Sequence, residues 1–181
     1  AGAQCRELGG LFQAAARMTG ATRAEVETAL AGHGHEVPGV AAPLAAYQPA
    51  VVAGGFVYTA GQLPVVAGDL TARGPVGPDG LALTDARSAA RICALNALAA
   101  GFSAVGDGAR LRLVKVVVFV NATAGFTDHP AVADGASELF GSALGEAGVH
   151  ARSAVGVVSL PKDAAVELDA VFEIVVTGTV G

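Results

Sequence analysis

The alternation of apolar and mostly acidic residues in the last predicted strand, residues 165–177, constrains the fold more than any other feature of the sequence. One set of alternate positions is apolar: Val166, Leu168, Ala170, Phe172 and Ile174. The positions between them hold Glu167, Asp169, Val171 and Glu173. Side chains two residues apart share one face of a strand, so this pattern predicts a sheet whose apolar face packs against helices. The other face, with its acids, then meets water, a ligand or a neighbouring subunit.

The N-terminal half of the chain is predicted to contain a short helix and a hairpin. Thr22 and Glu25 have the spacing of a capping box, which places a helix over residues 22–31. Alternating residues around the glycine pair 54–55 predict a hairpin over residues 50–62. Residues 67–80, rich in glycine, proline and aspartate, are predicted to be a loop.

The C-terminal half is predicted to alternate between helices and strands. The elements expected there are a helix capped by Thr84 that ends near Ala104, a strand over 111–121, a helix with an apolar stripe from Val132 to Ala143, and strands over 152–158 and 165–177. The LPKDA segment predicts a turn between the last two strands, which would make them a hairpin. The order indicates an α+β fold with two helices on one face of a mixed sheet.

The composition limits the environment and the partners of the chain. Hydrophobic residues make up 52% of the 181 residues and charged residues only 15%, so we expect surplus apolar surface and an oligomer. The net charge of -5 argues against a nucleic acid partner. No uncharged apolar run has the length of a membrane helix, and two cysteines are too few for a disulfide framework. We therefore expect a cytoplasmic protein without a membrane partner.

The ends of the chain and its histidines carry further expectations. Residues 1–21 are predicted to be an N-terminal extension, flexible or partly helical, and residues 22–181 a single domain. His33 and His35 lie in a glycine-punctuated segment with no third His or Cys nearby, so no metal site is expected there. The glycines form neither a GxGxxG motif nor a Walker loop, which argues against a nucleotide cofactor.

Arg152 and Glu167 are the strongest candidates for chemistry. The Arg152 guanidinium stands in an otherwise neutral stretch and suits a carboxylate ligand, or an ion pair with an acid of the protein. Glu167 suits a general acid–base or water-positioning role, or is one of several acids on a wet face. A hairpin of the last two strands would separate these residues by on the order of 16 Å. They would then share a ligand only if a bulge resets the register or if the site forms between subunits.

Four blocks occur in order along the chain: AYQPAVVAGGFVYTAGQLP, ARICALNALAA, FVNATAGFTDHPAVADGASELFG and HARSAVGVVSLPKDAAVELDAVFEIV. Together they resemble the reactive intermediate deaminase family, also called the YjgF/RidA or L-PSP family, and within it a subgroup of slightly longer bacterial proteins. The resemblance covers residues from about 22 to 176. It implies a chorismate-mutase-like α+β fold with a mixed six-stranded sheet, two long helices on one face, and a homotrimer with small-molecule clefts at the subunit interfaces.

The resemblance also implies an activity and a set of site residues. Deaminating members hydrolyse a reactive enamine or imine derived from an amino acid to a 2-keto acid and ammonia, without a cofactor. By position, Arg152 would hold the substrate carboxylate and Glu167 would position the attacking water. The other residues implied to contact substrate are Tyr47, Ala60, Gly61, Phe126 and Ala154.

Three positions depart from the family pattern. Ala60 stands where many active members have Ser, and Ala154 where they have Cys. Ala124 stands where many place Asn, with Asn121 three residues earlier. These departures leave substrate choice open and support an alternative, a non-catalytic trimer that binds small carboxylate metabolites for regulation. A third function, endoribonuclease or translation inhibitor, is disfavoured by the acidic charge and the lack of stacking aromatics.

Overall fold

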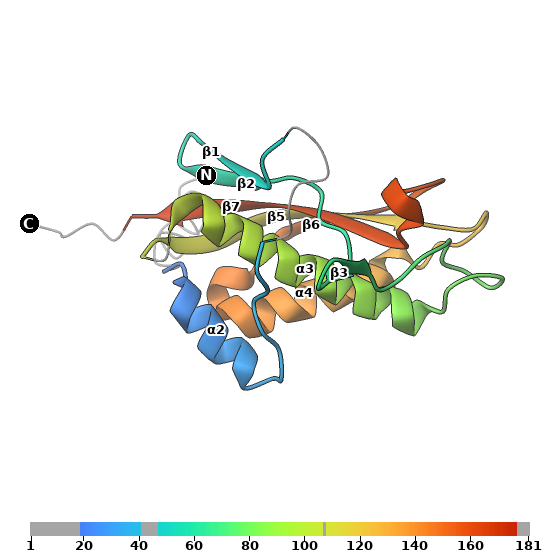
Figure 1. The fold of residues 1–181 in the computed structure, drawn as a ribbon, viewed down its shortest axis with the longest axis horizontal. Helices are drawn as coiled ribbons and strands as arrows, with labels where there is room; N and C mark the ends of the chain where they lie inside the picture. Colours follow the sequence, from blue (N-terminus) through green and yellow to red (C-terminus); the bar gives the residue numbers. More distant parts are fainter. Residues whose placement is uncertain (1–18, 41–46, 107, 177–181) are drawn as a thin grey trace, which may run out of the picture.

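The structure is a computed structural model that describes residues 19–40, 47–106 and 108–176. Its helices all lie on one side of a sheet (Figure 1). They are α2 (Arg23–Ala31), α3 (Leu83–Val105) and α4 (His129–Leu144). The strands are β1 (Ala50–Ala53), β2 (Phe56–Thr59), β3 (Val65–Val66), β4 (Asp69–Leu70), β5 (Arg110–Asn121), β6 (Ala151–Val157) and β7 (Val166–Val175). Two short 3-10 turns cover Gly145–Gly148 and Pro161–Asp163.

β5 is the strand that organises the sheet. The strand order is β1-β2-β7-β5-β6, with β5 antiparallel to β7 and parallel to β6. The expected mixed α+β architecture is confirmed, although the described residues place five strands in this sheet instead of the expected six. The predicted hairpin of the last two strands is wrong, because β5 lies between them. Its C-terminal end bonds to both: the Asn121 N–H donates to the Ala165 carbonyl, and the Ala122 N–H to the Val157 carbonyl.

The N-terminal hairpin forms as predicted, with β1 and β2 in register from Ala50 opposite Thr59 onward. Its turn residues Gly54 and Gly55 have φ values of 57° and 81°, the left-handed region that favours glycine at both positions of a tight hairpin turn. A second ribbon, β3 paired with β4, lies partly within the segment predicted to be a loop. Strands of two residues carry too little alternation to be recognised in a sequence.

The first residues of α2 and α3 show whether the predicted helix caps form. The capping box of α2 is confirmed: Thr22 Oγ1 accepts from the Glu25 N–H, and the Glu25 carboxylate accepts from the Thr22 N–H. For α3 the predicted cap, Thr84, is wrong by two residues. Ala82 is the N-cap and makes no side-chain cap hydrogen bond. The Ala82 carbonyl accepts from the Ala86 N–H, so the helix begins before Thr84.

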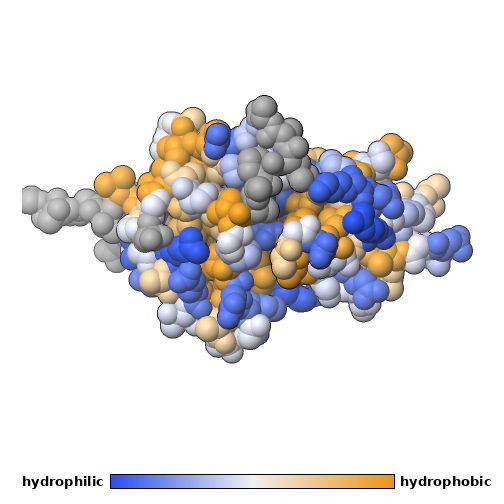
Figure 2. All heavy atoms as spheres, viewed as in Figure 1, coloured by the Kyte–Doolittle hydropathy of each residue, from blue (hydrophilic) through white to orange (hydrophobic). Residues whose placement is uncertain are grey.

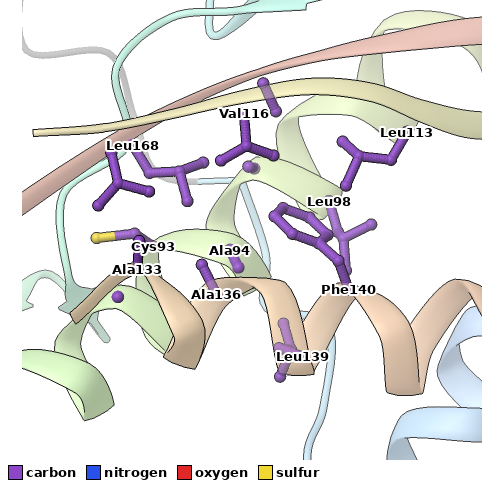
Figure 3. Packing of buried hydrophobic residues seen from close by; sticks show 14 of the residues in the cluster. Cys93, Ala94, Leu98, Leu113, Val116, Ala133, Ala136, Leu139, Phe140 and Leu168 are labelled. Carbon is purple, nitrogen blue, oxygen red and sulfur yellow. The ribbon is translucent and has the colours of Figure 1, made fainter. Parts of the chain in front are cut away.

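The hydrophobic core lies between the sheet and the two long helices (Figure 3). Leu113 and Val116 of β5 and Leu168 of β7 point toward Leu98 of α3 and Phe140 of α4. The buried face of α3 is mostly alanine, which lets the helix backbones approach closely. By length and composition α3 is the one described helix that could cross a membrane, but 61% of its most apolar window is buried here, as expected of a core helix.

The opposite face of the sheet carries no helix in the described part of the chain (Figure 1). Tyr58 of β2 and Val155 of the edge strand β6 lie on this face, and each is 42% exposed. Apolar residues also gather over the β1–β2 hairpin (Figure 2), where Val51 and Val52 are about half exposed. The apolar excess of the composition therefore lies at least partly on the sheet surface.

Two glycines of α4 provide a matched test of how closely α3 and α4 pack. A Cβ on Gly135 would overlap the Arg87 carbonyl of α3, whereas a Cβ on Gly141 would meet nothing. We expect Gly135→Ala to destabilise the protein by about 1–3 kcal/mol through overpacking. We expect Gly141→Ala to stabilise it by up to about 1 kcal/mol, because alanine favours helix. Urea unfolding at one protein concentration measures both, and equal effects would contradict the close packing at Gly135.

Candidate functional site

Glu167 projects from β7 onto the helix-free face of the sheet, which we call the open face. It lies opposite Phe119 of β5. The burial pattern of β7 confirms the predicted alternation: Val166, Leu168 and Phe172 are buried, and Glu167 is partly exposed. A Cβ on Gly61 would overlap the Glu167 carboxylate, so the backbone of residue 61 lies against that carboxylate. The structure therefore brings together two of the residues implied by the family resemblance.

Glu167 differs from the other glutamate of this face. The Glu173 carboxylate accepts from the Arg112 guanidinium at 2.6 Å. Asp169, like Glu167, is in no ion pair among the described residues; burial raises the pKa of its carboxyl group, and backbone hydrogen bonds and the positive charge of Lys115 only partly oppose this. Glu167 has no ion pair within the described residues. Burial of its carboxyl group, followed by the negative charge of Asp169, raises the pKa of Glu167 above its ordinary value. A half-buried carboxylate without a cation is unlike a solvated surface acid, which favours the functional interpretation of Glu167.

A pocket of about 550 Å³ is lined in part by Gly61. Its polar lining side chains are Tyr47, Gln62, Asn96 and Lys162, and the rest of the lining comes mainly from residues 38–40, 61–68 and Pro49. Tyr47 is 44% exposed. Ala60 is fixed by its backbone: its N–H donates to the Pro49 carbonyl, and its carbonyl accepts from the Gln62 amide. Tyr47, Ala60, Gly61 and Glu167 thus form one group, which we call the acid half-site.

Arg152 belongs to a second group. On the edge strand β6 it is in register with the buried Val116 of β5, so its side chain lies on the helix-covered side of the sheet. Its Nη1 donates to Asp134 Oδ1 at 2.9 Å and to Ser137 Oγ at 3.0 Å, both on α4. The Arg152 side chain keeps 23% of its surface exposed.

Ala154 and Phe126 lie on the same side as Arg152, where both pack against the core. The Phe126 ring meets His129 edge-on, with the ring centroids 5.3 Å apart. The His129 ring in turn lies over Gly156, because a Cβ there would overlap it. Arg152, Ala154 and Phe126 form what we call the cation half-site.

The two half-sites of one chain cannot act on one small ligand. Arg152 is in register with Val116 and Glu167 with Phe119, and these positions of β5 face opposite sides of the sheet. Two strand spacings and three residues of rise separate their Cα atoms by about 14 Å. The register shift in β5 lies between Leu113 and Lys115, outside this span, so it does not bring them together.

Two further residues, Asn121 and Cys93, have structural roles. Asn121 is buried, and its amide donates to the Ala164 carbonyl, so it supports the turn before β7. Cys93 is buried in α3, where desolvation, and then the charge of Glu167, raise the pKa of its thiol far above the ordinary value. Among the described residues no group of three or more His, Cys, Asp or Glu is placed to hold a metal ion.

Sequence reasoning missed Asp134, Ser137 and His150, which surround Arg152. The Ser137 hydroxyl lies 3.1 Å from His150 Nε2, and His150 Nδ1 lies 2.6 Å from the Gly148 carbonyl. Asp134 and Ser137 are three residues apart on the predicted second helix, so they share a helix face. That spacing is a usable signal only once β6 is known to pack beside this helix.

Known proteins provide a comparison for this fold. The family described as "YjgF/chorismate_mutase-like, putative endoribonuclease" matches residues 27–172. Protein TCP17 of Trypanosoma cruzi is 44% identical over 145 residues, which are 78% of this chain and 89% of that protein.

Two solved structures add detail. The protein Atu1372 of Agrobacterium tumefaciens is 38% identical, with a TM-score of 0.77 over 84% of this chain and 94% of that chain. TdcF of E. coli with bound serine is 27% identical, with a TM-score of 0.50 over 77% of this chain and 94% of that chain. The sheet, the helices and the matched span lead to one conclusion: the chain belongs to the YjgF/RidA-like family.

Proposed function

We propose that the protein hydrolyses reactive enamine or imine derivatives of amino acids to 2-keto acids and ammonia, at sites formed between subunits. The observation that carries the proposal is the division of the candidate site: a half-buried carboxylate without a cation on one face, and a guanidinium on the other. An imino acid carries both groups that these residues recognise, a carboxylate and an electrophilic carbon open to water. The serine bound in the TdcF structure supports an amino-acid-like ligand.

The proposed mechanism assigns one task to each half-site. Arg152 holds the substrate carboxylate, which fixes the position of the neighbouring imine carbon. Ionised Glu167 accepts a proton from a water molecule as the water oxygen forms a bond to that carbon. With the imine nitrogen protonated, this addition gives a neutral carbinolamine. Glu167 returns its proton to the nitrogen and then accepts the hydroxyl proton as the C–N bond breaks, which leaves the keto acid and ammonia. The ammonia takes up that proton and leaves as ammonium, which restores the ionised carboxylate. Tyr47 and the backbone at Gly61 form the wall of the pocket.

The proposed assembly is a homotrimer, in which the acid half-site of one subunit meets the cation half-site of the next. The helix-free face of the sheet, with Tyr58 and Val155 exposed among its apolar residues, offers the surface that carries Glu167, and the β6 edge beside α4 offers the surface that carries Arg152. A cyclic assembly places the same two surfaces together at every interface, so each of three sites receives one Arg152 and one Glu167. The surplus of hydrophobic residues in the sequence supports the same assembly.

A second candidate function keeps the same ligand and omits the chemistry. Ala60 provides no hydroxyl beside Gly61, so the acid half-site has fewer groups to orient water. The protein would then be a trimeric sensor of small carboxylate metabolites. An endoribonuclease role, which the family description names, is weakened by the net charge of -5, since phosphate contacts dominate nucleic acid affinity.

Mixed assemblies test both the activity and the division of the site. We expect Arg152→Ala and Glu167→Gln each to abolish the acceleration, over the uncatalysed rate, of ammonia release from 2-iminobutanoate generated in situ by an amino-acid oxidase. Co-expression of the two variants in equal amounts is expected to restore activity at about one quarter of the sites, because each active site needs one intact residue from each of two subunits.

Arg23→Ala is the matched control, since Arg23 pairs only with Glu27 on the surface of α2 among the described residues. It should leave the rate unchanged. Light scattering should give three times the 17.7 kDa chain mass for every variant. Mixed assemblies without activity would contradict a site shared between subunits, and a wild-type protein that binds keto acids without accelerating hydrolysis would favour the sensor.

The raised pKa of Glu167 predicts an acid limb in the pH dependence of the rate. The base must be ionised, so kcat/KM should rise with pH through the folded-state pKa, which lies above that of an ordinary glutamate. Asp169→Asn removes the second cause of the shift and should move the limb to lower pH. The exposed loop residue Asp79 supplies the control Asp79→Asn, for which an equal displacement would exclude Glu167 as the titrating group.

A further inference from the structure

The Arg152 guanidinium is held on one side only. Both of its contacts in the described part of the chain are made by Nη1, to Asp134 Oδ1 and to Ser137 Oγ. One NH2 group has two hydrogens, so these two acceptors use all that Nη1 can donate. The described residues provide no acceptor for Nε or Nη2. These two nitrogens form one straight edge of the planar group, and that edge matches the two oxygens of a carboxylate.

The contact to Ser137 has a fixed direction. The Gly148 carbonyl can only accept a hydrogen bond, so the nearby His150 Nδ1 carries the proton. In the neutral ring Nε2 is then an acceptor, and it receives the Ser137 O–H. The Ser137 oxygen therefore turns its lone pairs toward Arg152.

The His150 ring is itself held in place. It packs edge-on against Phe140, with the ring centroids 5.9 Å apart, and Phe140 is fully buried in the core. The chain of contacts from the Gly148 carbonyl to Nη1 thus starts from fixed backbone and ends on the guanidinium.

We propose that Asp134 and the Ser137–His150 pair are positioning residues that anchor Nη1 of Arg152 and so present its Nε–Nη2 edge to the ligand carboxylate. This inference rests on the proposed function, because it takes Arg152 as the carboxylate-binding residue. An unanchored arginine side chain loses several rotamers when it binds a ligand, and anchoring removes most of that cost beforehand. The anchor also restricts the ligand to a planar group that accepts two parallel hydrogen bonds, such as a carboxylate.

The charge of Asp134 acts on ligand binding in the opposite direction to positioning, and the experiment must distinguish the two effects. Its negative charge repels a ligand carboxylate, so a purely electrostatic role would make Asp134 a competitor of the ligand. Asp134→Asn keeps an acceptor oxygen and removes the charge, whereas Asp134→Ala removes both. Positioning predicts that Asn rescues what Ala loses, and competition predicts tighter binding by both variants.

The experiment is calorimetric titration of the full-length protein with 2-oxobutanoate, the keto acid product. We expect Asp134→Ala and Ser137→Ala each to weaken binding about three- to tenfold, the scale of one newly immobilised long side chain. Asp134→Asn should stay within about twofold of wild type. In turnover assays the Ala variants should raise KM more than they lower kcat, since the anchor acts on carboxylate binding.

Two controls match the substitutions. Ser142→Ala lies on the same helix at an exposed position, and Glu146→Ala removes an exposed acid just beyond it. Both should bind like wild type. Asp134 has 46% of its side chain exposed, so its substitution leaves the core intact, and thermal unfolding of each variant checks this.

Three results would overturn the inference while leaving the proposed function standing: wild-type affinity in both Ala variants, tighter binding by Asp134→Ala, or an Asn variant as weak as the Ala variant. Each of these results leaves the proposed function standing only if Arg152→Ala abolishes binding. Undiminished binding by Arg152→Ala would instead overturn the proposed function, and the inference with it. The Arg152→Ala titration therefore separates the two failures.

Discussion

The pairing of β5 with a different strand at each edge determines where chemistry can take place in this chain. A strand has only two faces, and strands in register share them, so every side chain of β6 and β7 is assigned a side by its partner on β5. Arg152 falls on the helix side and Glu167 on the open side. No rotamer change can reverse that assignment, because it is fixed by the backbone hydrogen bonds of the ladder.

The open face is neither a normal surface nor a normal core. Its charged groups are largely satisfied within the chain: Arg112 with Glu173, and Lys115 with Ser153 at 2.7 Å. Groups that are already paired lose less solvation when another surface covers them, which makes such a face suitable for association. Glu167 and Asp169 are in no ion pair among the described residues, and Glu167 is the one that lies against Gly61, so covering this face also isolates a group suited to accept a proton.

Local patterns in the sequence were sufficient to predict much of the fold. The capping box of α2, the glycine turn of the first hairpin and the alternation along β7 all depend on neighbours within a few residues, and all three form. The order of the strands depends on which edges pair across the chain. The LPKDA segment has the composition of a hairpin turn and yet connects strands on either side of β5. Composition cannot distinguish a hairpin turn from a connection between strands on either side of a third strand, because both need a tight, polar segment.

The same limit applies to the candidate site. The family blocks imply site roles for Arg152, Glu167 and Gly61, and the structure places the backbone of Gly61 against the Glu167 carboxylate. What holds Arg152 in place lies on another element, and periodicity within one element cannot reveal it. Asp134 would be read in isolation as a solvated helix residue, since nearly half of its side chain is exposed.

Division of the site between two surfaces has a thermodynamic consequence. A ligand that needs both a guanidinium from one subunit and a carboxylate from another binds well only to the assembled form, so mass action makes ligand binding and assembly favour each other. The proposed anchoring of Arg152 also favours assembly and ligand binding together. In the proposed trimer, a guanidinium already ordered within its own subunit loses little further freedom when the acid half-site of the neighbouring subunit completes the site, so little ordering cost opposes assembly.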